Sequence, residues 1–203
     1  MWTILEDFTE RATDIASEYG DLIRLYEDKN KKLEILRMLE IYKPTTTLLS
    51  VVAGGINEKE IGDIVKYVLN SDYIVSSEIH TVTFTGQNIS RFNQHKRVTT
   101  PSVIQQICQN NSFLKINDFL PSPFAHPLCY SNVYMLRLEN GSYYPLSRFI
   151  PPQQMKEMLT GNLYIEPSQK TEEILSDVIN NMWSSENLND QEIEVLNALR
   201  QLM

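Results

Sequence analysis

A histidine and a cysteine lie three positions apart in a proline-rich segment near the middle of the chain. His126 and Cys129 follow Pro121 and Pro123 in this segment. Imidazole nitrogen and thiolate sulfur are the side-chain atoms that zinc and iron bind in proteins. A closed zinc site needs four ligands, and no other cysteine or histidine lies near this pair. A protein that binds zinc through His126 and Cys129 alone is therefore a weak interpretation, although both are candidate metal ligands.

A second candidate site is the turn formed by Gly54 and Gly55, which Asn57 follows. The turn separates an apolar stretch at residues 45–52 from a helical pattern at residues 58–69. A glycine pair followed by an N-cap residue is typical of a tight strand-to-helix turn, and Asn57 suits the N-cap position. A helix N-terminus can also bind a carboxylate or ribose hydroxyls. The pattern alone favours the structural interpretation, but both stay open.

His80 is the third candidate, near the C-terminal end of a predicted strand at residues 74–84. Ligands of parallel α/β folds bind outside the carboxyl ends of the strands, so His80, Thr81 and Thr83 gain functional weight from their position. An inward-facing histidine whose hydrogen bonds are satisfied would give the same pattern, and the sequence does not choose between the two. Cys108, at the end of a short helix, is interpreted as a small buried hydrophobic residue.

The elements that position Gly55, Asn57 and His80 follow an α/β order. Apolar residues recur at helical spacing over residues 3–43, and Pro44 ends this region. Residues 45–52 form a continuous apolar run, which predicts a strand buried on both faces. With the helix at 58–69 and the strand at 74–84, this run predicts a right-handed βαβ unit with parallel strands.

The rest of the chain is predicted to be a hairpin among helices. A short helix begins at Pro101, with Thr99 or Thr100 as its N-cap, and ends near residue 109. Asn140 and Gly141 separate two strand-like segments, which is a strong hairpin signal. Three helical segments follow, at residues 151–160, 171–183 and 189–202.

Composition excludes several classes of protein. The chain has 203 residues, a formal net charge of −8 and two cysteines. An acidic chain is unsuited to sequence-independent binding of nucleic acid, which needs a basic surface. No apolar run approaches the roughly 20 residues that span a bilayer, and the N-terminus has no signal-peptide pattern. Two cysteines give no disulfide framework, so we expect a cytoplasmic protein without transmembrane segments.

In order and motif, the chain resembles the C-terminal half of a radical S-adenosylmethionine (radical SAM) enzyme family that includes the archaeal tetraether-lipid synthase and its methyltransferase-like relatives. The resemblance covers about residues 20–185. It implies an α/β fold, a partial (β/α) TIM-type barrel with a small α+β C-terminal extension and amphipathic C-terminal helices. The expected divisions are a partial barrel at 1–112, a proline-rich loop and β-hairpin at 113–150, and a helical tail at 151–203.

The resemblance also implies roles for the candidate residues. Gly55 and Asn57 match the family's strand-end turn and would face the pocket for S-adenosylmethionine or substrate, and His80 would lie nearby. The family's loop reads Pro-x-Pro-Cys-x-His-Pro-x-Cys, and its cysteines are plausible ligands of an auxiliary iron–sulfur cluster. Phe124 stands in place of the first cysteine here, so we expect the metal site to be degraded, with His126 and Cys129 as its remaining positions.

Arg148 matches the end of the family's hairpin. It could pair with a carboxylate or phosphate, or be a solvated charge at a strand end, and the second interpretation is preferred.

Radical SAM enzymes hold a 4Fe-4S cluster through three thiolates spaced C-x-x-x-C-x-x-C. Cys108 and Cys129, 21 residues apart, cannot form that motif. We therefore expect that this chain alone neither binds the cluster nor is catalytically competent, and that it forms the substrate-side portion of a radical SAM-type enzyme. Its partner would be a cluster-bearing radical SAM half, or a second copy joined through open sheet edges. The alternative is a non-catalytic interaction or regulatory domain derived from such a half-barrel.

Overall fold

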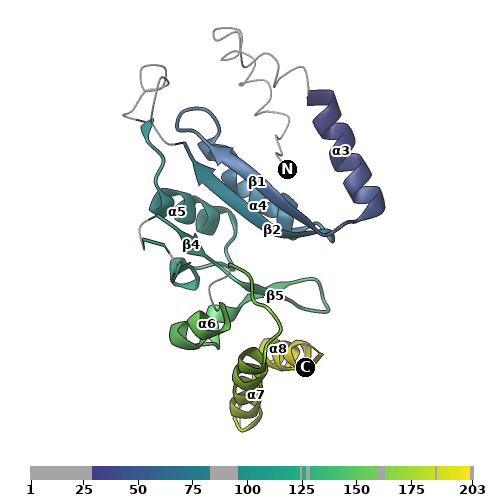
Figure 1. Cartoon of the computed structure of the whole chain (residues 1–203), viewed down its shortest axis with the longest axis vertical. Helices are drawn as coiled ribbons and strands as arrows, with labels where there is room; N and C mark the ends of the chain where they lie inside the picture. Colours follow the sequence, from purple (N-terminus) through teal and green to yellow (C-terminus); the bar gives the residue numbers. More distant parts are fainter. Residues whose placement is uncertain are drawn as a thin grey trace. The chain divides into compact units, whose positions relative to one another are not determined.

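The computed structural model describes residues 29–82, 96–123, 125–126, 129–159, 163–185 and 187–201. The chain divides into two compact units, Met1–Phe113 and Leu114–Met203, and each combines helices with small sheets (Figure 1). Residues 3–28 of the helical region predicted at 3–43, and the end of the strand predicted to reach residue 84, lie outside the described residues. Within the described ranges, no helix is both long and apolar enough to cross a membrane.

The first unit contains a parallel βαβ arrangement, as the sequence predicts. Strands β1 (Thr46–Val52) and β2 (Ile74–Thr81) pair in parallel, and α4 (Ile61–Leu69) connects them after a short 3-10 turn, η2 (Glu58–Glu60). The apolar residues of α4 recur on one face because they must cover the sheet. Its core with the strands consists of Leu48, Ile64, Tyr73 and Ile74.

Strand β1 is fully buried on one face, not on both as predicted. Leu48, Ser50 and Val52 on the face beneath α4 are buried, whereas Leu49 and Val51 on the opposite face are half-buried. The apolar run was expected to lie between two covering layers. The described residues supply the α4 layer for one face, and this accounts for the alternation along the strand.

Two further helices belong to this unit. Helix α3 (Lys29–Tyr42) ends before Pro44, as predicted, because the residue before a proline disfavours helical geometry. Helix α5 (Thr100–Asn110) has Thr99 as its N-cap: the Thr99 hydroxyl accepts a hydrogen bond from the backbone N–H of Ser102, whose side chain accepts one from the backbone of Thr99. This reciprocal pair fixes the start of α5, which packs along α4.

The second unit is a set of helices on short antiparallel strand pairs. A 3-10 turn, η5 (Ile116–Asp118), precedes β3 (Leu120–Pro121), which pairs with β4 (Ser131–Asn132). Strands β5 (Met135–Arg137) and β6 (Tyr143–Pro145) form the predicted hairpin, and Gly141 in its turn has a φ of 81°. The remaining elements are η6 (Leu146–Arg148), α6 (Pro152–Leu159), α7 (Gln169–Trp183) and α8 (Asp190–Gln201).

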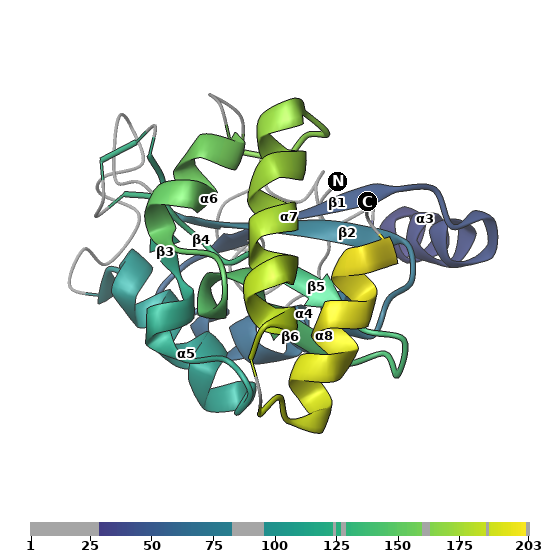
Figure 2. The same ribbon diagram turned by 90° about the horizontal axis from the view of Figure 1, so that it is seen from below.

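One apolar core joins the hairpin to these helices. Leu138 and Leu146 from the hairpin region pack with Met155 of α6, Ile174 of α7 and Leu199 of α8, all buried. Helices α7 and α8 lie side by side at the C-terminal end (Figure 2).

The fold is thus mixed α/β with small sheets. Among the described residues each strand pairs with a single other strand, and no closed barrel is present. A partial barrel therefore stays a prediction.

Candidate functional site

The glycine turn after β1 is packed against the backbone and side chain of Lys96. Gly55 has a φ of 79°, a conformation that favours glycine. A Cβ atom at Gly54 would clash with the carbonyl oxygen of Lys96, and one at Gly55 would lie 2.7 Å from the Cδ and 2.9 Å from the Nζ of Lys96. Both glycines therefore have a structural reason to be glycine, and an ammonium group lies directly over the turn.

Asn57 braces this loop and does not act as the predicted side-chain N-cap. Its side chain is buried, its Oδ1 accepts a hydrogen bond from the N–H of Ala53 at 2.8 Å, and its Nδ2 donates one to the carbonyl of Val51 at 2.8 Å. No cap bond joins it to η2, and the α-helix begins only at Ile61. The side chain turns back toward β1 because two backbone groups there need partners.

His80 lies on the face of β2 that α4 does not cover. Its Nε2 is 3.2 Å from Oε2 of Glu78, two positions earlier on the same face, and 49% of the His80 side chain is exposed. The register places His80 beside Val51 and Glu78 beside Leu49. His80 is thus a half-exposed, carboxylate-paired histidine and not one enclosed by the described residues.

These positions gather at one edge of the first unit. Strand pairing places the ends of β1 and β2 together, with the N–H of Val82 donating to the carbonyl of Val52. Val51 joins two of the predicted residues, because its carbonyl binds Asn57 and its strand partner is His80. A role for Gly55, Asn57 and His80 in binding a cofactor stays a prediction.

The predicted metal ligands lie in the second unit. His126 and Cys129 are exposed, and the backbone N–H of Cys129 donates to the carbonyl of His126 at 2.8 Å, which closes a turn. Within the part of the chain that the structure describes, no three potential ligands come together, and Phe124 lies outside that part. These described residues do not fit an iron–sulfur cluster, and metal binding by His126 and Cys129 stays a prediction. Cys108 is half-buried in α5.

Arg148 forms a two-point ion pair with Asp118, so the preferred interpretation as a solvated charge is wrong. Nε lies 2.9 Å from Oδ1 and Nη2 lies 2.7 Å from Oδ2, and 5% of the Asp118 side chain is exposed. The backbone N–H of Lys115 also donates to Oδ2, and the Ser147 hydroxyl donates to the Asp118 carbonyl. The pair joins η5 to η6, and the sequence gives no local signal for Asp118.

Electrostatics within this ion pair favour the charged forms of both groups. Burial alone would raise the pKa of the Asp118 carboxyl, but the hydrogen bonds from Arg148 and Lys115 and the charge of Arg148 outweigh it, and the pKa is lowered. The hydrogen bond to Asp118 in turn raises the pKa of Arg148.

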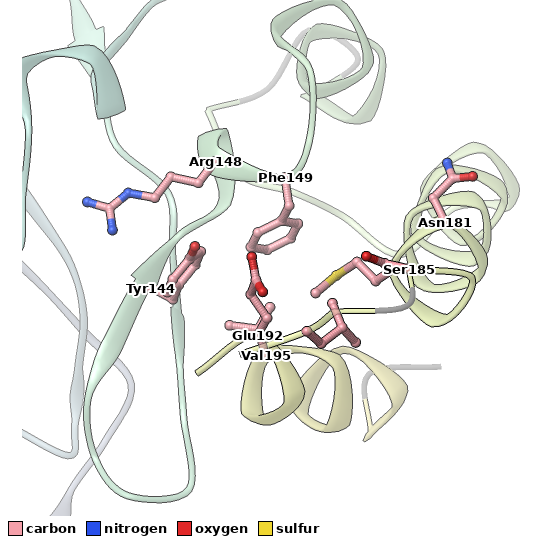
Figure 3. Close-up of a pocket in the computed structure, with 9 residues that line it drawn as sticks. Tyr144, Arg148, Phe149, Asn181, Ser185, Glu192 and Val195 are labelled. Carbon is pink, nitrogen blue, oxygen red and sulfur yellow. The ribbon is translucent and has the colours of Figure 1, made fainter. Parts of the chain in front are cut away.

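A cavity of about 280 Å³ opens beside this ion pair, between η6 and the helices α7 and α8 (Figure 3). Tyr144 and Phe149 form one wall, with ring centroids 5.8 Å apart and planes at 28°. The guanidinium of Arg148 lies 5.3 Å from the centroid of Tyr144. The carboxylate of Glu192, on α8, lies beside these two rings. A second cavity, of about 370 Å³, lies between the proline-rich segment and α6 and is lined mainly by apolar groups.

Comparison with known proteins gives one informative similarity. The chain is 24% identical over 137 residues to 7,8-dihydro-6-hydroxymethylpterin dimethyltransferase of Methanocaldococcus jannaschii, and the alignment covers 57% of this chain and 27% of that protein. The chain therefore matches about a quarter of its relative's length. No family model matches the chain. The similarity hints at a relation to radical SAM-type methyltransferases and confirms no particular family.

Proposed function

We propose that this chain is the C-terminal, substrate-side portion of a radical SAM-type enzyme and acts with a partner that carries the 4Fe-4S cluster. The similarity to a pterin dimethyltransferase over a quarter of that protein supports the proposal. The relative's name specifies a pterin substrate, and we propose a pterin-like substrate for this chain as well. The observation that carries the proposal is the parallel sheet of the first unit, whose two strands pair only with each other among the described residues.

A parallel sheet of two strands is an incomplete layer. Parallel sheets normally have both faces covered, and two-stranded sheets have little stability of their own. Within the described ranges β1 and β2 pair only with each other, and α4 supplies the cover for one face. The outer edges of the strands and the half-buried face with Leu49 and Val51 would be completed by strands and side chains of a partner.

The residues at the carboxyl end of this sheet would then face a shared pocket. When bound, S-adenosylmethionine supplies a 5′-deoxyadenosyl radical for C–H activation, with the cluster held by the partner. In this chain, the turn at Gly55 lets the Lys96 side chain approach the backbone closely, and Asn57 holds that turn in place. His80, oriented by Glu78, offers an imidazole on the face of the sheet that α4 does not cover.

Anaerobic co-purification of the full chain from its native host tests the proposal. We expect a stoichiometric partner bearing C-x-x-x-C-x-x-C, with about four irons per complex. Leu49→Lys should reduce recovery of that partner because it places a charge on the face to be covered, whereas Glu173→Lys on exposed α7 should not. Thermal melting of both variants checks that they fold. A monomeric chain without iron in the recovered material would overturn the proposal.

A non-catalytic interaction or regulatory domain is the second candidate. It is favoured by the replacement of the family's cysteine by Phe124 and by the exposed apolar side chains along α3, which are Ile35, Met38, Ile41 and Tyr42. The same purification separates the two, since a stable partner without cluster cysteines and without iron supports the second.

A further inference from the structure

The cavity shown in Figure 3 combines an aromatic wall with a fixed carboxylate. Its volume of about 280 Å³ lies just below the roughly 300 Å³ at which pockets for drug-sized ligands begin, so it suits a smaller molecule. The lining comes from three separate segments: β6 with η6, the C-terminal end of α7, and the start of α8. Its described residues belong to the second unit, so the cavity does not depend on the sheet of the first.

The aromatic wall, formed by Tyr144 and Phe149, is held in place by neighbouring side chains. The guanidinium of Arg148 lies over Tyr144, and Asp118 fixes that guanidinium through two hydrogen bonds. Tyr144 in turn stacks on Phe149, whose ring borders the cavity. A flat ring system can extend this stack, since aromatic rings prefer offset-stacked arrangements.

The carboxylate of Glu192 is also held in place. Its Oε2 accepts a hydrogen bond from the backbone N–H of Asn189 at 2.9 Å, and its own N–H donates to Oδ1 of Asn189 at 2.9 Å. This reciprocal capping box fixes the start of α8. No hydrogen bond to Oε1 of Glu192 occurs among the described residues, and Figure 3 shows the carboxylate beside the rings of Tyr144 and Phe149.

The charges around the cavity determine what it can accept. Arg148 is paired with Asp118, so among the described residues that line the cavity the carboxylate of Glu192 is the charge without an ion-pair partner. A carboxylate accepts hydrogen bonds and repels anions, which favours a neutral or cationic ring with N–H donors on its edge. Asn181 and Ser185 at the rim offer an amide and a hydroxyl for further polar groups of the ligand.

We propose that this cavity binds the ring of a pterin, with the ring stacked on Phe149 and its amino and ring N–H groups donating to Glu192. The class of ligand follows from the aromatic wall and the carboxylate; the choice of a pterin among flat heterocycles rests on the proposed function. The site is separate from Gly55, Asn57 and His80, and it would give the second unit a substrate-recognition role.

Titration of the full chain with 6-hydroxymethylpterin tests the proposal, because ring stacking quenches the ligand's fluorescence. We expect saturable quenching that Phe149→Leu weakens by about tenfold, since the ring stack is lost. Glu192→Gln should weaken binding to a similar extent while an amide oxygen still caps α8. Lys156→Ala, at the second cavity, is the matched control and should leave the affinity unchanged.

Two further ligands, lumazine and S-adenosylhomocysteine, test the specificity of the cavity. Lumazine has the same ring shape with an oxo group in place of the 2-amino donor, so it should bind more weakly than the pterin. The proposal would be overturned by absence of saturable quenching, by an affinity of both cavity variants equal to that of the natural chain, or by displacement of the pterin by S-adenosylhomocysteine with higher affinity. The binding assay needs neither the partner nor the cluster. If the chain bound the pterin but no partner were co-purified, only the proposed function would be contradicted, and the proposed pterin site would stand.

Discussion

Arg148 and Asp118, 30 positions apart in the sequence, are joined by two short hydrogen bonds between guanidinium and carboxylate. The pair connects the turn before the proline-rich segment with the turn after the hairpin. It also holds the guanidinium over Tyr144, the first ring of the aromatic wall. The stability of the second unit and the shape of its cavity therefore depend on the same contact.

Removing the carboxylate should destabilise the second unit strongly. Asp118→Asn leaves the guanidinium of Arg148 without its ionic partner in a mostly buried position, and we expect a loss of about 3 kcal/mol in the free energy of unfolding. Urea unfolding followed by fluorescence of Trp183, which lies in this unit, measures it. Asp177→Asn, an exposed position on α7, is the control and should cost less than about 0.5 kcal/mol. Equal losses would contradict the prediction.

The same ion pair should make stability depend on acidic pH. Burial acts to raise the pKa of Asp118, yet the bonds from Arg148 and Lys115 lower it below the value of about 3.9 expected for an unfolded chain. A lowered folded-state pKa stabilises the protein above the unfolded value, and this stabilisation disappears as the pH falls through the folded value. The free energy of unfolding of the natural chain should therefore fall more steeply below about pH 4 than that of Asp118→Asn. Parallel slopes would refute this.

The elements that the sequence predicts correctly are those with local signals. Asn140 and Gly141 mark the hairpin because an Asn-Gly pair suits its tight turn, and Thr99 begins α5 because its hydroxyl reaches the nearby N–H of Ser102. The parallel pairing of β1 and β2 follows from the apolar runs on either side of a helix. Each of these depends on neighbours within a few positions or on a simple periodicity.

The features that the sequence does not predict depend on distant or competing partners. Nothing near Asp118 in sequence indicates that Arg148 will bind it. The Asn57 side chain could cap the following helix or bind the backbone at the end of β1. Its hydrogen bonds to that backbone form only once the turn is closed, and the local sequence does not show this. The cover of β1 on one face depends on which segments lie over it, which a run of apolar residues cannot specify.

Three glycine substitutions should differ in cost according to what each Cβ meets. Gly141→Ala meets nothing within 4 Å, so it should cost about 1–2 kcal/mol for the positive φ alone. Gly55→Ala has a similar φ and meets the side chain of Lys96, which can move, so its cost should be only slightly higher. Gly54 is not among the glycines with a positive φ, but its Cβ would meet the backbone carbonyl of Lys96, so Gly54→Ala should cost about 1–3 kcal/mol from overpacking alone.

Thermal and urea unfolding of the three variants measure these losses in the free energy of unfolding. Combining Gly55→Ala with Lys96→Ala should recover little stability, because the backbone conformation and not the side chain dominates the cost. A Gly54→Ala variant as stable as the natural chain would show that the close approach of Lys96 is not maintained in solution.

Replacing Lys43 by glycine should increase the stability of the first unit. It follows α3 with a φ of 45°, directly before Pro44, and its N–H donates to the carbonyl of Leu39 at 2.7 Å. A side chain in this left-handed conformation costs about 1–2 kcal/mol, whereas glycine adopts it freely at the end of a helix. The ion pair between Lys43 and Asp72 is half-exposed at 3.1 Å and contributes little. Lys43→Gly should therefore raise the free energy of unfolding of the first unit by about 0.5–1 kcal/mol.

Lys43→Ala provides the matched control for this prediction. It removes the same ion pair with Asp72 but keeps a Cβ atom in the left-handed conformation, so it should be neutral or slightly destabilising. The difference between the glycine and alanine variants isolates the backbone conformation, since both have lost the ammonium group. If the two variants were equally stable, the residue before Pro44 would not adopt this conformation in solution, and the end of α3 would need to be redrawn.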